Sequence, residues 1–233
     1  MARIICLANS RRPGGRCVAG IDTETGQWVR PVLKGNGAIP DRMTLFGNHQ
    51  LVPLDIIECD LSAPHLMTKY QRENSIVTSS RFRLMGAVTS SGVLKYCSEK
   101  SVILHGHTKV VEPALLDGIA PEQWASLELR RLPRVKFEPD DKKPGRWVAS
   151  FRAGGTSGAS YSLRVTDPVA EERLKGGEDL NGEWLATISL TEPISYPEYN
   201  LPALCYKLVA ALMPIGNKVK GSPPLLPHRR PEQ

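Results

Sequence analysis

The chain has 233 residues, a net charge of +6 and 41% hydrophobic residues, which is enough sequence for one large domain or two of ordinary size. No apolar run approaches the roughly 20 residues of a membrane helix, and the N-terminal apolar run is too short for a secretory signal. We therefore expect a cytoplasmic protein with no membrane partner. The five cysteines form no Cys-x-x-Cys pair, which argues against a zinc ribbon and a disulfide scaffold.

The positive charge is concentrated in the first part of the chain and in its tail. Residues 1–100 carry 13 Lys and Arg against 8 Asp and Glu, residues 101–213 carry 13 against 15, and residues 214–233 carry 4 against 1. An uneven basic excess of this kind favours a polyanionic partner without identifying it.

The chain opens with a predicted β-hairpin whose connecting loop is rich in arginine and glycine. Two short apolar runs, residues 3–8 and 17–21, flank the stretch Asn9-Ser10-Arg11-Arg12-Pro13-Gly14-Gly15-Arg16. Arginine presents a planar fork of donors that matches phosphate, and glycine lets the backbone approach a ligand closely. The pattern predicts a loop that meets an anion, and a merely solvated hairpin tip is the alternative.

The rest of the first half is also predicted to be β. An alternating run at residues 27–32 and a largely apolar run at 55–61 predict strands, and residues 101–104 are expected to close the unit. We expect Trp28 to pack inside this first barrel, because tryptophan is highly buried on average. Tyr70 and Phe82 lie beside basic residues and are the better candidates for stacking on bases.

A helical connector is predicted over residues 113–132. The segments 112–118 and 121–129 lack β-branched runs, and Pro121 suits a first helical turn. We expect this connector to join two domains.

The second half is predicted to be β, followed by a helix and a tail. Runs at 134–137, 146–153, 161–166 and 184–190 predict strands, and the spacing of apolar residues over 201–212 predicts a C-terminal helix. The Pro-rich, basic tail at 214–233 is expected to be disordered.

A short repeat links the two halves, because residues 15–20 resemble residues 145–150. Several short strands in each half, without a βαβ rhythm, favour small barrels of the OB type. The expected fold is mainly β: a first OB-like barrel over 1–112, the connector 113–132, and a second barrel with a C-terminal helix over 133–213, followed by the tail 214–233.

Several segments in order resemble the prokaryotic dual OB-containing domain family. The resemblance rests on residues 7–12, 15–22, 26–32, 71–74, 161–168, 188–190 and 205–210. It implies two OB-like barrels in tandem, no established catalytic activity, and a role as a binder of nucleic acid or nucleotides, in some members within defence systems. It carries over no ligand residues.

No constellation typical of catalysis or metal binding is evident in the sequence. His105 and His107 lack a third ligand of the kind that zinc requires. The residues Ser10, Cys17 and Ser160 lack the flanking signature of a nucleophile. The glycine-rich run 154–158 lacks the lysine of a phosphate-binding loop, and Asp167 is expected to cap the turn that follows it. We therefore expect no cofactor, no metal and no enzymatic activity.

The sequence thus favours a non-enzymatic module that binds a single-stranded nucleic acid or a nucleotide, as a subunit of a larger nucleic-acid-processing or antiviral defence assembly. A protein-interaction subunit that makes no direct contact with nucleic acid, and a nucleotide-processing enzyme, are the alternatives. DNA, RNA and free nucleotide remain open as ligands. The candidate nucleic-acid-binding residues are Asn9, Ser10, Arg11, Arg12, Arg16, Arg30, Tyr70, Arg72, Tyr206 and Lys207.

Overall fold

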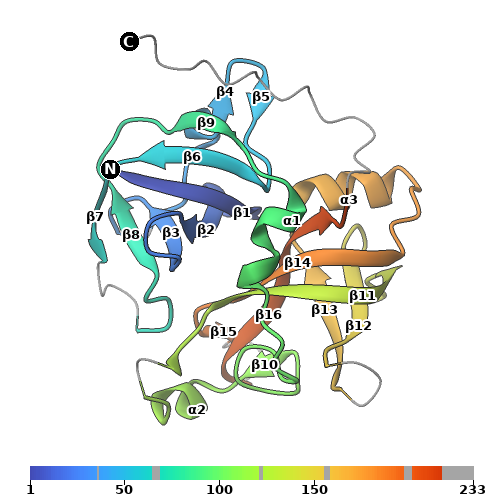
Figure 1. The fold of residues 1–233 in the computed structure, drawn as a ribbon. Helices are drawn as coiled ribbons and strands as arrows, with labels where there is room; N and C mark the ends of the chain where they lie inside the picture. The colour runs from blue at the N-terminus through green and yellow to red at the C-terminus, as the bar shows by residue number, and fades with distance from the viewer. Residues whose placement is uncertain (36, 65–68, 121–122, 155–157, 197–200, 217–233) are drawn as a thin grey trace, which may run out of the picture.

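The computed structural model describes residues 1–35, 37–64, 69–120, 123–154, 158–196 and 201–216. Two β-barrels lie side by side, with short helices between and beside them (Figure 1). The mainly β prediction is confirmed. None of the helices in these ranges has the length and apolar character needed to cross a membrane. The predicted disordered tail, beyond residue 216, and residues 155–157 of the glycine-rich run lie outside the described ranges.

The first barrel contains one parallel strand pair and is closed by a nearly continuous pair of strands, β6 and β7. In its sheet the order is β7-β8-β3-β2-β1-β6-β9, with β3 and β8 parallel. The barrel closes because β6 and β7 follow one another, separated by Asp60 alone. Its strands are β1 (Ala2–Arg12), β2 (Gly15–Asp22), β3 (Trp28–Val32), β6 (Asp55–Cys59), β7 (Leu61–Pro64), β8 (Asn74–Val77) and β9 (Arg83–Ala87). Between β3 and β6 lie η1 (Asp41–Met43), β4 (Leu45–Phe46) and β5 (His49–Gln50).

The second barrel repeats this connectivity. The order β10-β16-β13-β12-β11-β14 is closed by pairing of β14 with β16, and β13 and β16 are parallel. Each barrel therefore has five strand positions in the arrangement of an OB barrel, and the short sequence repeat falls on the second strand of each. The elements are β11 (Leu127–Pro139), β12 (Trp147–Arg152), β13 (Ser160–Val165), α3 (Pro168–Lys175), β14 (Gly182–Leu190), β15 (Ile194–Tyr196) and β16 (Leu201–Pro214).

The predicted helical connector is wrong for most of its length. Between the barrels lie α1 (Ser90–Val93), η2 (Leu94–Tyr96), β10 (Val110–Val111) and the five-residue α2 (Pro113–Asp117), whereas β11 already begins at Leu127. The expected closing strand at 101–104 is also absent from the described structure. Ile103 and Leu104 instead pack into the second core, so this segment belongs energetically to the second barrel.

The predicted C-terminal helix is wrong, since residues 201–214 form strand β16. This strand pairs with β14, β13, β10 and β15 and runs between the second core and the first barrel. Cys205 and Val209 face the second core, while Ala210, Ala211 and Met213 face the first barrel. A strand buried on both sides lacks the alternating pattern of an exposed one, so its apolar spacing resembled that of a helix.

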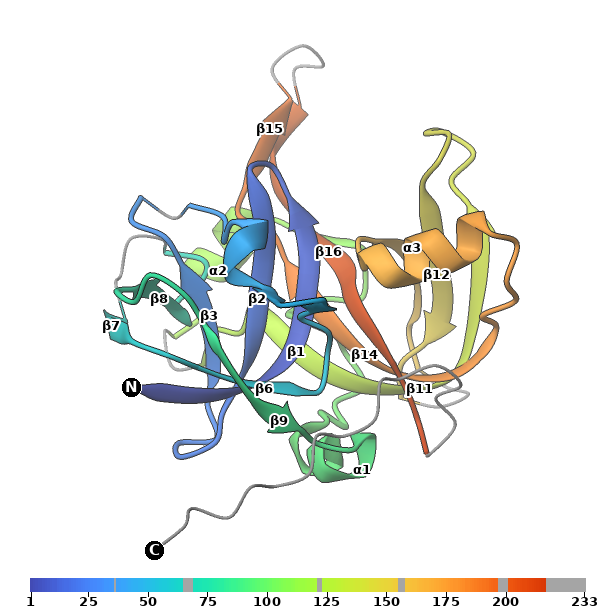
Figure 2. The ribbon, with the colours of Figure 1, turned by 90° about the horizontal axis from the view of Figure 1, so that it is seen from above.

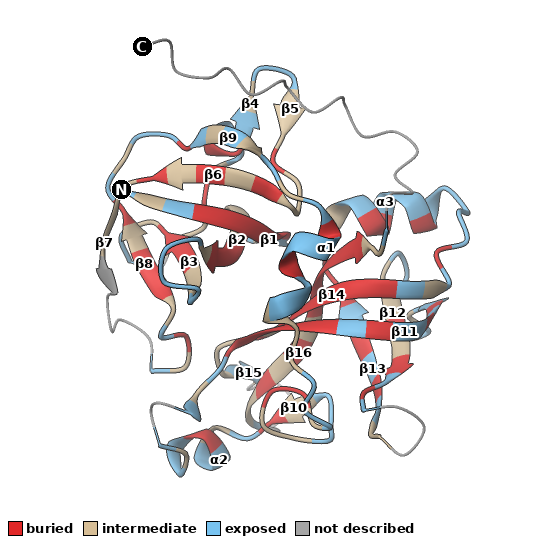
Figure 3. Cartoon of the chain, in the orientation of Figure 1, coloured by how far each residue is buried: buried red, intermediate tan, exposed pale blue. Residues whose placement is uncertain are grey.

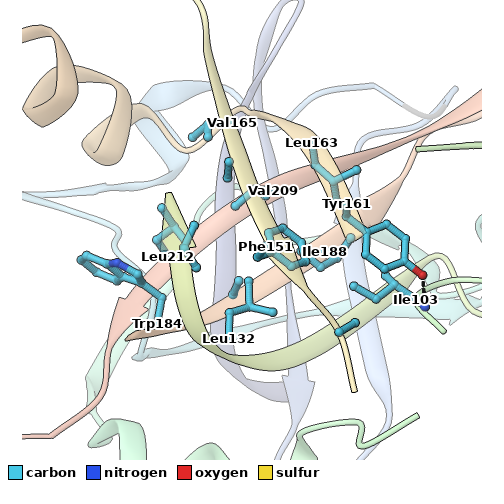
Figure 4. Packing of buried hydrophobic residues seen from close by; sticks show 14 of the residues in the cluster. Ile103, Leu132, Phe151, Tyr161, Leu163, Val165, Trp184, Ile188, Val209 and Leu212 are labelled. Carbon is cyan, nitrogen blue, oxygen red and sulfur yellow. Dashed lines mark hydrogen bonds between the residues drawn. The ribbon is translucent and has the colours of Figure 1, made fainter. Parts of the chain in front are cut away.

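Each barrel has its own core. Ile4, Cys6, Val18 and Ile57 belong to the first core. The second core is shown in Figure 4, where the hydroxyl of Tyr161 accepts a hydrogen bond of 3.0 Å from the Ile103 amide. Two further apolar clusters lie between the barrels and join β1 and β2 to β11, β14 and β16.

Trp28 does not lie inside the first barrel. It is half-buried and packs against the two clusters between the barrels, which include Leu129, Leu185 and Ala211. Trp28 is thus only partly buried, and it lies on the outer face of the first barrel, where the second barrel covers it.

Candidate functional site

A cleft of about 390 Å³ lies between the first hairpin and helix α3. Figure 2 shows α3 beside the upper part of β16, across from the β1–β2 hairpin. The cleft therefore draws on both barrels. Its lining residues are Asn9, Arg11, Arg16, Gln50, Leu51, Pro53, Asp167, Pro168, Val169, Glu172 and Arg173.

The hairpin that supplies three of these residues is longer than the sequence predicted. Arg11 pairs with Arg16 and Arg12 with Gly15, so most of the predicted loop is strand and the turn itself is Pro13-Gly14. Gly15 has φ +148°, and a Cβ there would lie 2.3 Å from the backbone oxygen of Ile39. Glycine is therefore required where the hairpin end packs closely on the segment before η1.

The arginines of the cleft are held in place by carboxylates. Arg11 Nη2 lies 3.2 Å from Glu172 Oε1, and its Nε lies 3.7 Å from Glu171 Oε2. Arg16 Nε lies 2.6 Å from Asp41 Oδ1. Arg11, Glu172 and Asp41 are largely exposed, and exposed ion pairs contribute at most about 1 kcal/mol. A phosphate can therefore compete with the exposed carboxylates of Glu172 and Asp41 at little cost.

Asn9 is buried in the wall of the cleft. Its Nδ2 donates a hydrogen bond of 2.7 Å to the Leu51 carbonyl, which fixes the segment after β5 against the hairpin. Its Oδ1 is buried without a partner among the described residues. Ser10 is also buried, at 6% exposure, and of the two residues only Asn9 lines the cleft.

Asp167 closes the end of the cleft at the start of α3, and the prediction that it caps the following turn is confirmed. Its Oδ1 accepts hydrogen bonds from the Val169 and Ala170 amides, and its Oδ2 accepts one from the Leu212 amide. Burial raises the pKa of Asp167, and these three bonds oppose the rise. Both oxygens are thus used to hold the helix against β16.

Arg12 lies at the end of the same hairpin. It is half-buried and, within the ranges that the structure describes, forms neither an ion pair nor a side-chain hydrogen bond. The hairpin therefore brings Arg11, Arg12 and Arg16 to one end of the first barrel.

Arg30 was expected on the surface, and the structure corrects this. Its side chain is 2% exposed, and its Nη2 lies 2.8 Å from Glu73 Oε1 and 2.9 Å from Ser126 Oγ. Ser126 also donates a short hydrogen bond to Glu73. Because its side chain is buried, Arg30 is inaccessible to a ligand. Its contacts instead join the first barrel to the start of the second.

Tyr70 and Arg72 lie away from the cleft, in a stack that includes a residue the sequence did not single out. The rings of Tyr70 and Trp124 are parallel within 4°, with centroids 5.7 Å apart, and the Arg72 guanidinium lies 4.9 Å from the Trp124 ring centre. Asp117 accepts a hydrogen bond from the Tyr70 hydroxyl. Trp124 comes from the other half of the chain, so no local pattern indicated the stack.

The placement expected for Lys207 is also wrong. This residue is 2% exposed, and its Nζ donates a hydrogen bond to the Gly106 carbonyl and lies 5.2 Å from the Tyr161 ring centre. Burial lowers the pKa of Lys207 to about 8, against a smaller opposing effect of Glu128. Because β16 is a strand, Lys207 points into the second barrel and its neighbour Tyr206 points out.

Tyr206 is half-buried and lies beside Tyr196, with ring centroids 6.3 Å apart in an edge-on arrangement. Phe82, the other expected stacking residue, is 2% exposed and belongs to the first core. Of the aromatic and basic candidates outside the hairpin, Tyr70, Arg72 and Tyr206 thus remain partly accessible.

Among the described residues, no group of three or more His, Cys, Asp or Glu side chains is arranged to hold a metal ion. His105 Nε2 lies 2.8 Å from the Ala125 carbonyl. The cleft residues that the sequence did not indicate are Gln50, Leu51 and Pro53 and, from α3, Pro168, Val169, Glu172 and Arg173. Their contribution depends on how the barrels pack, which no local sequence signal indicates.

A family model of the dual OB-containing domain matches residues 2–212. This match spans both barrels and ends within β16. Searches of curated proteins and of solved structures found no match to the chain.

Proposed function

The chain belongs to the dual OB-containing domain family, and from this premise we propose that it is a non-enzymatic module that binds a single-stranded nucleic acid or a nucleotide. OB barrels typically bind oligonucleotides through the face of strands 2 and 3 and the loops beside it. The module acts as a subunit of a larger assembly for nucleic-acid processing or defence.

The observation that carries this proposal is the cluster of three arginines at the end of the first hairpin. The turn between β1 and β2 is one of the two loops that border the OB binding face. Arg11 and Arg16 are oriented there by exposed carboxylates, and Arg12 has no partner among the described residues. The adjacent cleft offers apolar surface from Leu51, Pro53 and Val169, which is suited to a base or a sugar.

The non-enzymatic part of the proposal is supported by the use already made of the cleft's acidic groups. Asp167 has both oxygens engaged by backbone amides. Glu172 is exposed and paired with Arg11 and Lys175. Both carboxylates are thus engaged in structural contacts, which leaves neither available as a general acid or base.

The test replaces all three hairpin arginines and measures binding at several salt concentrations. The variant is Arg11→Ser/Arg12→Ser/Arg16→Ser, and the probes are fluorescent oligo(dT), fluorescent oligo(U) and a fluorescent ATP analogue. We expect weaker binding, and a plot of log affinity against log salt flattened by roughly 0.7 for each phosphate that an arginine no longer neutralises. The control, Lys34→Ser/Lys95→Ser/Lys109→Ser, removes the same charge from other exposed positions.

The outcomes separate the alternatives. If the wild type binds none of the three probes, the nucleic-acid proposal is wrong and the protein-interaction subunit becomes the better interpretation of the fold. If it binds and the hairpin variant matches the control, the hairpin is a solvated tip and the ligand lies elsewhere on the molecule.

A further inference from the structure

The two barrels differ in one respect that bears on ligand binding: the first has its strand 2–3 face covered. On β2 and β3, Ala19, Ile21, Trp28 and Arg30 alternate with the core residues Val18 and Val29 and therefore point out of the barrel. Ala19, Ile21 and Trp28 pack in the clusters between the barrels, and Arg30 bonds to Ser126. The second barrel therefore occupies the face on which an OB barrel usually binds its ligand.

The equivalent face of the second barrel is open. This barrel contacts the first through β11, β14 and β16, which are its strands 1, 4 and 5. Strand β12 lies on the far side from the first barrel in both views (Figures 1 and 2). Along β13 buried and exposed residues alternate (Figure 3), so one face of the strand packs in the core and the other meets solvent.

The open face is polar and basic. In the register of β12 and β13, Val148 lies opposite Arg164, Ser150 opposite Ser162, and Arg152 opposite Ser160. Ser150 and Ser162 are joined by a hydrogen bond of 3.3 Å. Together with the adjoining end of β11 and the turn before β12, this surface carries six basic and three acidic side chains, namely Lys136, Lys142, Lys143, Arg146, Arg152 and Arg164 against Glu138, Asp140 and Asp141.

Arg146 lies two residues before Val148, the partner of Arg164 in the strand register, so the two arginines are diagonal neighbours on this face. In the part of the chain that the structure describes, neither forms a salt bridge, unlike Arg11 and Arg16. Partial burial lowers the pKa of Arg164, and the positive charge of Arg146 lowers it further, against the effects of Glu171 and Asp140. Two guanidinium groups that repel one another are stabilised by an anion placed between them.

Aromatic side chains border the same face. Tyr196 is close enough to Arg164 to influence its pKa, and it contacts Tyr206 edge-on. Tyr196 lies on β15, in the connection between strands 4 and 5 of the barrel, which is the second loop that borders an OB binding face. Tyr206 lies in the first part of strand 5 itself. Bases of single strands stack on such side chains with little sequence preference.

The face is continuous with the cleft. Glu171 pairs with Arg11 at 3.7 Å and also acts electrostatically on Arg164, so it neighbours both surfaces. A single strand that leaves the hairpin can therefore pass over α3 onto β13.

We propose that the outer face of β12 and β13 is a second binding surface for single-stranded nucleic acid, with Arg146 and Arg164 on the phosphates and Tyr196 as a stacking platform. This inference rests on the proposed function, and it adds a second site for the nucleic acid at a distance from the β1–β2 hairpin. The hairpin of the first barrel then binds one end of the nucleic acid, and the second barrel binds the nucleotides that follow.

The test is a comparison of two double variants in the full chain. With fluorescent oligo(dT) at low salt, Arg146→Ser/Arg164→Ser is expected to bind about tenfold more weakly, the order that loss of hydrogen bonds to charged groups produces. The salt plot should flatten by roughly 0.7 for each phosphate that is released. Lys34→Ser/Lys95→Ser removes the same charge elsewhere and should bind nearly as the wild type does. Thermal unfolding checks that both variants are folded.

A negative charge introduced in the middle of the face tests this surface without changing the arginines. Ser162 is exposed on β13, and Ser162→Glu is expected to abolish binding of oligo(dT), whereas Ser91→Glu on α1 should not. A fluorescent mononucleotide, which fits the cleft alone, should bind all of these variants equally.

The possible failures are distinct. If the wild type binds neither oligo(dT) nor the mononucleotide, the proposed function and this inference both fall. If it binds oligo(dT), the hairpin variant loses binding, and both Arg146→Ser/Arg164→Ser and Ser162→Glu bind as the wild type does, the inference alone is overturned. Capture of a protein by this face, with no affinity for oligo(dT), would also overturn it.

Discussion

Two basic residues of this chain, Arg30 and Lys207, are each 2% exposed, and the structure compensates them differently. Arg30 has a carboxylate partner in Glu73, so its charge is balanced where it is buried. Lys207 has the Gly106 carbonyl and the face of Tyr161. A buried ammonium without a directly bonded carboxylate costs folding free energy until it loses its proton.

The burial of Lys207 predicts a stability that rises in alkaline solution. Below pH 8 both the folded and the unfolded chain hold this proton; between the folded pKa of about 8 and the ordinary lysine value of 10.5, the unfolded chain holds more. Stability rises with pH wherever the unfolded state binds more protons. The free energy of unfolding of the wild type relative to Lys207→Met should thus increase by up to about 3 kcal/mol across this window, at about 1.4 kcal/mol per pH unit.

The measurement is urea unfolding of both proteins at pH 8 and at pH 10.5. Burial also raises the pKa values of the thiols, for Cys59 to about 12 and for Cys205 to about 11. These thiols lower stability at high pH but act equally in both proteins, so the difference isolates Lys207. A difference that is flat with pH would show that its ammonium is solvated.

Among the secondary-structure elements, the strands with one face in a core were predictable and β16 was not. The runs at 146–153 and 161–166 alternate in hydrophobicity, and they form β12 and β13. Strand β16 is buried on both faces, so apolar residues occupy consecutive positions along it instead of alternate ones. Helix α3 was missed because Asp167 and Pro168 indicated only a turn, and the helix runs for eight residues.

For the candidate site, too, the features that depend on local sequence were predictable, and the features that depend on packing between the barrels were not. The hairpin end could be found from sequence, because Arg11, Arg12, Gly15 and Arg16 are local to one turn. Arg30 and Lys207 were misplaced, because whether a strand's outer face meets water depends on the partner barrel and on where β16 lies. Local composition contains no information about either.

Removing the side chain that caps α3 is expected to lower the free energy of unfolding more than removing a side chain in a surface turn. Asp167→Ala removes the acceptor of three backbone amides, one of them on β16, and unsatisfied buried donors cost about 1–3 kcal/mol each. We expect a loss of roughly 3 kcal/mol in urea unfolding. Asp179→Ala, which removes one exposed bond to the Asn181 amide, should cost less than about 1 kcal/mol. Equal losses would contradict the anchoring role of Asp167.

On the scale of the whole molecule, the two barrels share a substantial apolar interface. Leu129, Leu185, Ala211 and Met213 are all at most 1% exposed, and they face the outer side of β1 and β2. Hydrogen bonds cross the same boundary from Thr187 to the Leu7 carbonyl and from Gln71 to the Leu190 carbonyl. A boundary that is both apolar and hydrogen-bonded behaves as core rather than as a hinge.

The shared interface predicts that both barrels unfold together. Calorimetry should show a single transition whose calorimetric and van't Hoff enthalpies agree. Leu185→Ala at the interface should lower its midpoint, with a cost of about 2–5 kcal/mol. Val18→Ala in the first core should lower the same midpoint. Two resolved transitions, or a variant that shifts only part of the heat, would show independent barrels.

The position of β16 in the chain has a consequence for biosynthesis. On the ribosome, the first barrel is complete once β9 has emerged, but the second cannot close until β16 is made, because β16 pairs with both β13 and β14. During that interval the outer side of β1 and β2, with Ile21 and Trp28, lacks the β16 residues Ala211 and Met213 that cover it in the finished protein. Nascent chains that stall before β16 therefore expose apolar surface that chaperones bind, and the last strand to be translated completes the second barrel and its interface with the first.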